Sequence, residues 1–256
     1  MIDGLPPPKP GLWMPEKPAI VRPAEKRLIR PMSLMPVFSP VVGAAPAVTA
    51  SFLDSATDSA NQSSYSFTVT LANTTSGQII CVVGHIGSSS TQGSDISTLT
   101  IDGESGTEIF DTGTIDNSRI QIFRAPATAS TSGTVSISFD STEGACDVAL
   151  YHVENLVQNT VRNSDTGTAV SGTLTVSALA DGIVIAAAQT EPNNDGIGHS
   201  GGEHLPTADD ASYDITYDIT SDSNVDWTGI TRRWNAQVQS GNFGSNQNVT
   251  AAIVLR

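Results

Sequence analysis

The sequence predicts an all-β protein, a jelly-roll-like sandwich of two antiparallel sheets preceded by an extended proline-rich arm. Apolar residues make up 38% of the chain and charged residues only 15%, and 22 glycines accompany many Ser, Thr, Asn and Asp residues. This composition suits short strands joined by many turns. Several stretches alternate strictly, as where Tyr65, Phe67 and Val69 are separated by Ser or Thr. Such alternation is typical of a strand with one buried face.

Residues 1–47 are predicted to form the arm. Eleven of the 14 prolines, all the lysines and all four methionines precede residue 47. Proline fixes φ, lacks an amide donor and favours extended geometry in the residue before it, so neither a long helix nor a central strand can form here. Large apolar side chains recur between the prolines, although a solvated linker has no use for them.

We therefore expect the arm to dock along a partner's surface, with apolar anchors in pockets and a stiff backbone that lowers the entropy lost on binding. A disordered tail, or an arm folded back on its own domain, is the alternative. The expected contact residues are Leu12, Trp13, Met14, Ile20, Arg22, Arg27, Leu28, Ile29, Arg30 and Phe38.

Charge divides the chain at nearly the same place. Residues 1–50 hold six basic and three acidic residues, a net +3, whereas the remainder holds six basic and 23 acidic residues, a net −17. An acidic domain repels phosphate backbones, so nucleic acid is not an expected partner. The sequence also contains no apolar run long enough to span a bilayer and no signal-peptide core, which predicts no membrane partner.

Residues 48–256 are predicted to form one acidic β-sandwich domain. Residues 133–138 and 172–177 resemble each other and each leads into a further apolar strand, which favours a jelly roll that uses the same kind of hairpin twice. Two Ig-like halves split near residues 157–171 are the alternative. We expect strands near residues 50–54, 64–72, 77–86, 96–102, 108–111, 119–125, 133–140, 145–156, 172–179, 181–190, 212–220, 226–239 and 246–256.

Cys81 and Cys146 are the only cysteines, and each lies in an apolar run typical of a strand. Because free cysteine is readily buried, we expect two buried, unpaired thiols in a reducing compartment. A disulfide is the alternative, and metal binding by two isolated cysteines is weaker still.

No sequence motif predicts catalysis. The chain has no Gly-x-Ser-x-Gly, no His-Glu-x-x-His, no phosphate-binding glycine loop and no zinc spacing. His85 and His152 lie in predicted strands, where a structural role is expected. We therefore expect no catalytic residue and no cofactor, although a pair of glycosidase carboxylates would leave no spacing to recognise.

Residues 191–204 read as a long polar loop between two strands. Asn193, Asp195 and Glu203 offer the hard oxygen ligands that Ca²⁺ prefers, and His199 and His204 could serve a transition metal. The loop matches no defined ion-binding motif, however. An exposed turn-rich loop is therefore the favoured interpretation.

Trp227 and Trp234 flank Arg232 and Arg233 in a predicted strand. Aromatic and arginine side chains together can stack on sugars or anchor an interface. Tryptophan at such positions is more often part of a core. The cluster is a candidate glycan or interface site on these grounds.

The run PGLWMPEKPAI at residues 10–20, followed by a lysine-free β domain rich in Ser, Thr and Gly, resembles structural proteins of tailed-bacteriophage virions. This resemblance implies a late structural component assembled in the host cytoplasm, such as a head decoration or cement protein. It also implies other virion proteins as partners, the major capsid protein first, and a homotrimer. A tail, collar or head-fibre protein that binds a host-surface glycan is the alternative.

Overall fold

The computed structural model describes residues 46–88, 93–115, 117–157, 160–168, 171–178, 182–192, 199–206, 211–218, 226–228 and 243–256. In these residues the expectation of an all-β fold is confirmed, because every element is a strand. Each strand pair is antiparallel and the strands form three sheets. The predicted arm lies outside the described residues.

The first sheet is built around one long strand, β8. Its strands are β1 (Thr49–Asp58), β2 (Gln62–Thr70), β3 (Gln78–Gly87), β4 (Ile96–Ile101), β5 (Glu104–Ser105), β6 (Thr107–Asp111), β7 (Ser118–Pro126) and β8 (Ser132–Glu154). The first half of β8 pairs with β2 and β4, and its second half pairs with β1 and β3. The sheet thus folds over on itself into two layers, which enclose a core of side chains from both halves.

The bend in β8 lies near Gly144. Val135, Ile137 and Phe139 face the enclosed core before the bend, and Cys146, Val148 and Leu150 face it afterwards, so the inward positions change from odd to even. The register with β3 slips at the same place, where Ile86 pairs with Ala145 and Gly87 with Glu143. One extra residue of this kind is a β-bulge, which bends a strand.

Two predicted strands, 133–140 and 145–156, are therefore one strand of 23 residues. The expectation of a break was wrong because Glu143, which precedes Gly144 in what looks like a turn, still pairs with Gln62 on one side and Gly87 on the other across the register shifts.

A tight hairpin joins β4 to β5. Its two turn residues, Asp102 and Gly103, have φ of 51° and 86°. Positive φ at both central positions is the type I′ geometry that favours Asp-Gly, and its twist matches that of the flanking strands.

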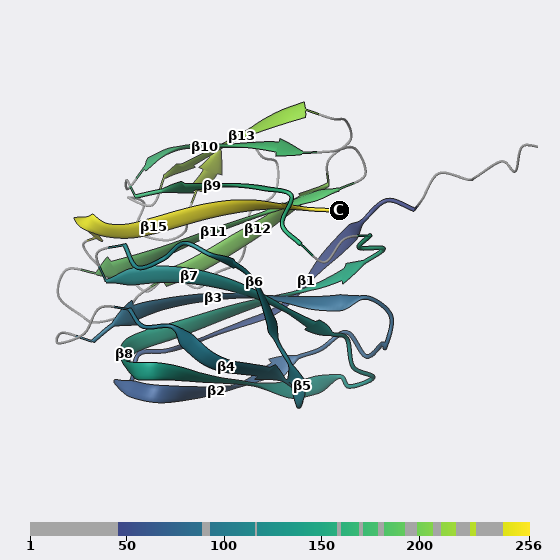
Figure 1. Ribbon diagram of the computed structural model, residues 1–256, viewed down its shortest axis with the longest axis horizontal. Coiled ribbons are helices and arrows are strands. Elements are labelled where there is room, and N and C mark those ends of the chain that lie inside the picture. The colour runs from purple at the N-terminus through teal and green to yellow at the C-terminus, as the bar shows by residue number, and fades with distance from the viewer. Residues whose placement is uncertain are drawn as a thin grey trace, which may run out of the picture. The chain divides into compact units, whose positions relative to one another are not determined.

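The two remaining sheets come from the C-terminal part of the described chain. The second sheet contains β9 (Asn163–Gly167), β11 (Ile183–Pro192), β12 (His199–Pro206) and β15 (Phe243–Leu255), in the order β12-β11-β15-β9. The third contains β10 (Ser171–Ala178), β13 (Ala211–Asp218) and β14 (Asp226–Thr228). Figure 1 shows these strands stacked on the layer of β3 and β7.

A second core joins the first two sheets. Ile80, Val82 and Tyr151 on one side pack in a single cluster with Ile185 and Ile253 on the other. Strand β3 is consequently buried on both faces, which explains why residues 79–83 are apolar without alternation. The described residues form three sheets, whereas the sequence predicted two. The prediction fell short because the sequence of a strand that is covered on both faces does not show how many layers surround it.

Candidate functional site

The most densely connected polar groups of the described residues lie at the bend of β8. His85 on β3 and Glu143 on β8 are both fully buried, and His85 Nδ1 lies 3.1 Å from Glu143 Oε2. The other ring nitrogen, Nε2, lies 3.1 Å from Oε1 of Gln121 on β7. The Gln121 amide nitrogen in turn donates to Glu108 Oε2 on β6 at 2.7 Å.

Glu143 also holds the segment that leads into β4. Ser94 donates to Glu143 Oε1 twice, from its hydroxyl at 2.6 Å and from its backbone N–H at 2.9 Å. The backbone N–H of Ile96 donates to Gln121 Oε1 at 3.3 Å. We call His85, Ser94, Glu108, Gln121 and Glu143 the crossover network, because the chain passes from the layer of β3 to the layer of β4 at this place.

The connection between β1 and β2 is fixed at the same point. The Tyr65 hydroxyl lies 2.7 Å from the carbonyl oxygen of Ala60 and 3.0 Å from that of Glu143, and can donate to either. Burial is the main cause that raises the pKa of Tyr65, so the phenol remains a donor over the ordinary pH range. The β1–β2 connection, the segment leading into β4 and the bend of β8 therefore meet at Glu143.

An ion-pair cluster borders the network toward solvent. Arg119 Nε donates to Asp111 Oδ1 at 2.8 Å, and the guanidinium also contacts Asp95. The Arg119 side chain is 9% exposed, whereas that of Asp95 is 63% exposed. Burial acts to raise the pKa of Asp111, but the Arg119 and Gly113 hydrogen bonds outweigh it and hold that pKa below its ordinary value.

The electrostatics of Glu143 follow the same logic. Burial acts to raise its pKa, yet the hydrogen bonds from His85 and Ser94 outweigh burial and lower the pKa below its ordinary value of 4.5. The carboxylate is thus ionised inside the protein because its neighbours replace water.

The network contains the three residue types of a hydrolase triad, but in an order that does not activate a nucleophile. In a triad the histidine accepts the serine proton and the carboxylate orients the histidine. Here Ser94 donates to Glu143, and both His85 nitrogens are already engaged. No ring nitrogen remains to take a proton from Ser94, and the arrangement ties segments together instead.

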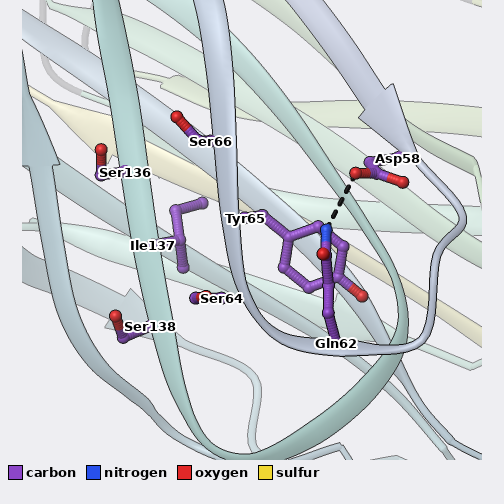
Figure 2. Close-up of a pocket in the computed structure, with 8 residues that line it drawn as sticks. All are labelled: Asp58, Gln62, Ser64, Tyr65, Ser66, Ser136, Ile137 and Ser138. Carbon is purple, nitrogen blue, oxygen red and sulfur yellow. Dashed lines mark hydrogen bonds between the residues drawn. The ribbon is translucent and has the colours of Figure 1, made fainter.

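A second polar feature is a concavity of about 430 Å³ on the outer face of β2 and β8. Figure 2 shows serine side chains from both strands beside Asp58 and Gln62, whose amide nitrogen donates to Asp58 Oδ2 at 2.9 Å. The lining residues are Asp58, Gln62, Ser64, Tyr65, Ser66, Ser136, Ile137 and Ser138.

The concavity continues into an array that we call the hydroxyl face. Ser64 stands opposite Ser138 and Ser66 opposite Ser136 across the β2–β8 pair, and β4 extends the array on the far side of β8. None of its ten positions is charged, although the chain carries a net charge of −14. They are Ser64, Ser66, Thr68, Thr70, Thr98, Thr100, Ser132, Thr134, Ser136 and Ser138.

The predicted site residues fall mostly outside the described residues. All ten arm residues do, and so do Asn193, Asp195, Arg232, Arg233 and Trp234. Trp227 lies on β14, opposite Tyr217 of β13. The structure therefore does not bring the tryptophan and arginine cluster together within its described part.

The polar loop predicted at 191–204 is shorter than expected. Strand β11 runs to Pro192 and β12 begins at His199, where Thr190 pairs with it. Glu203, the third calcium candidate, pairs with Ala186 inside β12. The expectation was wrong because residues 199–206 form the edge strand of the second sheet, where backbone hydrogen bonds to β11 need no apolar pattern. Among the described residues, no group of three His, Cys, Asp or Glu side chains could hold a metal ion.

Sequence reasoning missed the crossover network. His85 and Glu143 are 58 residues apart, and His85 and Gln121 are 36 apart, so no local spacing links them. One signal was present: His85 and Gln121 interrupt apolar strands, and a polar residue inside such a run needs a buried partner.

Comparison of the chain with protein-family models, with curated proteins and with solved structures gave no match. Within the described ranges, no helix is long and apolar enough to cross a membrane.

Proposed function

We propose that the chain is a non-enzymatic structural protein of a tailed-phage virion, a capsid decoration or cement protein that residues 1–47 anchor to the major capsid protein. Within this proposal the β unit has a jelly-roll-like plan and the protein acts as a homotrimer.

The observation that carries the proposal is the change in composition at residue 47. Before residue 47 the chain is basic and rich in proline, with large apolar side chains between the prolines. After residue 47 the chain is acidic and contains no lysine. An extended segment that buries apolar side chains on a partner, joined to a rigid body, is the arrangement that an assembly protein needs.

The described part of the β unit supports the same interpretation. The crossover network forms hydrogen bonds among its own members, and so does the Arg119 cluster, while Ser94 lacks a histidine to activate it. These groups stabilise a scaffold. His85, Gln121 and Glu143 are fully buried, so none of the three faces solvent.

The test compares two full-length variants for incorporation into particles. Burying a large side chain contributes about 1.5 to 3 kcal/mol before ordering costs, whereas an exposed ion pair contributes under about 1 kcal/mol. Trp13→Ala combined with Phe38→Ala should therefore reduce the copy number per particle more than Lys26→Glu, Arg27→Glu and Arg30→Glu together. Quantitative mass spectrometry of purified particles measures both.

Deletion of residues 1–45 extends the test. We expect a soluble β unit that folds cooperatively but no longer joins the particle. If the truncated protein is incorporated at the normal copy number, the arm does not hold the interface and the acidic domain must do so.

The alternative role, binding of a host-surface glycan by a tail, collar or head-fibre protein, has one observation in its favour. The serine-lined concavity, whose lining also includes Asp58, and the uncharged hydroxyl face offer hydrogen-bonding groups to a polyhydroxyl ligand. Copy number separates the two roles, since hundreds of copies per particle indicate decoration and a few to a few dozen indicate a tail or vertex protein.

A further inference from the structure

We propose that β2 is a docking edge at which a second copy of this chain pairs, antiparallel, through its own β2. The contact continues the first sheet from one chain into the next across a two-fold axis. Because it relates two chains, it is separate from the contact that holds the proposed trimer, and it does not depend on the virion role.

Strand β2 has a free edge within the described part of the chain. It pairs with β8 on one side, and no other described strand pairs with it. An edge of this kind presents a row of backbone N–H and C=O groups to which another strand can bind.

Two hydrogen bonds show which backbone groups of β2 face outward. The Leu71 N–H donates to the Thr131 carbonyl, on the side of β8, at 3.0 Å. The Thr70 N–H donates to Asp54 Oδ2 at 2.7 Å instead. Successive residues of an antiparallel strand point their backbone groups to alternate sides. The residues of β2 that face away from β8 without such a cap are therefore Ser64, Ser66 and Thr68.

The other edges of the first sheet carry features that prevent such pairing. Strand β1 holds two aspartates and an irregular register after Phe52. Strand β6 holds Glu108 and Asp111 and is also irregular, and β5 has only two residues. Charge, bulges and short length all block association between edges. Strand β2, in contrast, has nine residues with no charge and no proline, and its register with β8 is regular from Ser64 onward.

Charge favours a second copy as the occupant of this edge. Residues 51–256 carry a net charge of −17, so two copies repel each other unless they meet where neither is charged. The exposed side chains of β2 belong to the uncharged hydroxyl face. A basic segment would instead be attracted to an acidic edge such as β1. The uncharged edge is thus the place where this acidic chain can approach itself.

The outward residues define the register of the contact. They are centred on Ser66, so a two-fold axis there sets Ser66 opposite Ser66 of the second copy and Ser64 opposite Thr68. Each of these pairs exchanges two backbone hydrogen bonds. Cross-strand pairs of Ser and Thr add hydrogen bonds between their hydroxyls. The hydroxyl face would then continue from one chain into the other.

Two aspartates at the ends of this run set its salt dependence. Asp54 accepts from Thr70, and Asp58 accepts from Gln62. In the two-fold register the Thr70 end of one copy lies beside the Gln62 end of the other, so the aspartates of the two copies repel each other. Salt screens this repulsion, and the association should strengthen as salt is added. A contact between the basic arm and an acidic surface would show the opposite response.

The direct test is disulfide formation by the full-length Ser66→Cys variant under mild oxidation. Opposite residues of a hydrogen-bonded pair have Cα atoms about 5.5 Å apart, within the roughly 4.4 to 6.8 Å that a disulfide requires. We expect a product of two chains on a non-reducing gel. Cys81 and Cys146 are fully buried and should not react.

Ser136→Cys is the matched control for this reaction. Ser136 is exposed on the same face and lies opposite Ser66, but on β8. The two Ser136 residues of the pair would be three strand spacings apart, about 14 Å, which is too far for a disulfide. Equal cross-linking of Ser66→Cys and Ser136→Cys would overturn the proposal.

Ser64→Cys and Thr68→Cys test the register. Each faces the other residue across the two-fold axis, whereas like residues lie four positions apart along the strand, about 13 Å. A mixture of the two variants should therefore cross-link, and neither should do so alone. Cross-linking of either variant alone would contradict a two-fold axis at Ser66.

Sedimentation velocity of the full-length chain measures the association without a cross-link. Ser66→Lys sets two ammonium groups opposite each other and should halve the mass of the assembled species. Ser136→Lys makes the same change of charge on the same face and should leave that mass unaltered. An equal effect of the two variants would contradict the proposal.

A salt series on the unmodified chain completes the test. Between about 0.1 and 1 M NaCl the Debye length falls from about 10 to 3 Å, and we expect the association to strengthen. Association that weakens over this range would point to opposite charges at the contact and would overturn the pairing of two β2 strands. Loss of the docking edge with normal incorporation into particles would leave the virion role intact.

Discussion

Cys81 and Cys146 lie on neighbouring strands and face the core that the folded first sheet encloses. Both are fully buried and unpaired, as their apolar neighbours in the sequence predicted. Burial raises the pKa of Cys81 to about 12 and the pKa of Cys146 well above its ordinary value. Because the thiolate is the reactive form, these thiols behave as small apolar groups at neutral pH.

We expect Cys81→Ala and Cys146→Ala each to lower the free energy of unfolding by roughly 1 to 2 kcal/mol, through lost burial and a small cavity. Chemical denaturation of each variant measures the change. A reducing agent should leave the melting temperature of the unmodified chain unaltered. A large drop on reduction would mean that the two strands are covalently joined.

Single residues differ in how far the sequence predicts them. The burial of Cys81 follows from its immediate neighbours, which are isoleucine and valine. The partners of His85 do not, because Glu143 and Gln121 reach it only after β8 has bent and β7 has paired with β3. A network assembled from four strands has no signature in any single stretch of chain.

At the level of elements, β8 determines how the two layers are connected. Its bulge near Gly144 reverses which residues face inward, and Glu143 lies at that point with its side chain fully buried. Removing one partner of a buried hydrogen bond leaves the other partner unsatisfied, which is destabilising. The bend therefore depends on Glu143 remaining ionised.

Acid should consequently weaken the bend. The pKa of Glu143 is lower in the folded protein than its ordinary value of 4.5. The stability that the ionised carboxylate contributes is therefore fully present above pH 4.5, and it is lost as the pH falls through the lower pKa of the folded state. We expect Glu143→Gln to cost about 1 to 3 kcal/mol at neutral pH, because the buried groups of His85 and Ser94 lose the carboxylate with which they form hydrogen bonds.

Denaturant titrations between about pH 3 and 6 measure this effect. The Glu143→Gln variant should show a shallower loss of stability in acid than the unmodified chain. Glu154→Gln, at the end of the same strand, is the matched control and should leave the acid slope unchanged. If Glu143→Gln and the unmodified chain lose stability in parallel, the carboxylate does not hold the bend.

The strands themselves were largely predictable, and the exceptions have physical reasons. Alternation located β2 and β10, and apolar runs located β3 and β11, each within two residues of its observed bounds. Strands β9 and β12 were missed because they lie at the two edges of the second sheet, where backbone pairing with one neighbour suffices. Asn163 and Asp165 of β9 accept hydrogen bonds from the amides of Ser177 and Thr175, a role that no apolar pattern predicts.

At the level of the whole β unit, each sheet is built from one stretch of the sequence, whereas the second core contains residues from both stretches. Strands before residue 155 form the first sheet and strands after residue 162 form the others. This boundary lies close to the place where two Ig-like halves would separate. The second core nevertheless contains Ile80 and Val82 from one side of the boundary and Ile185 and Ile253 from the other. Shared burial of this kind favours unfolding as one cooperative unit.

Ile253→Ala tests this coupling. Ile253 is fully buried between the first two sheets, so truncation should lower the free energy of unfolding by about 2 to 5 kcal/mol. Hydrogen exchange at the amides of Val82 in β3 and Ala252 in β15 reports the two sheets separately. If they unfold together, protection of both amides should fall by the same factor, because each is exposed only through the global transition. Val157→Ala is the control, since that side chain is 65% exposed and should change neither amide. A fall confined to Ala252 would instead show two sheets that open independently and would favour two halves over one domain.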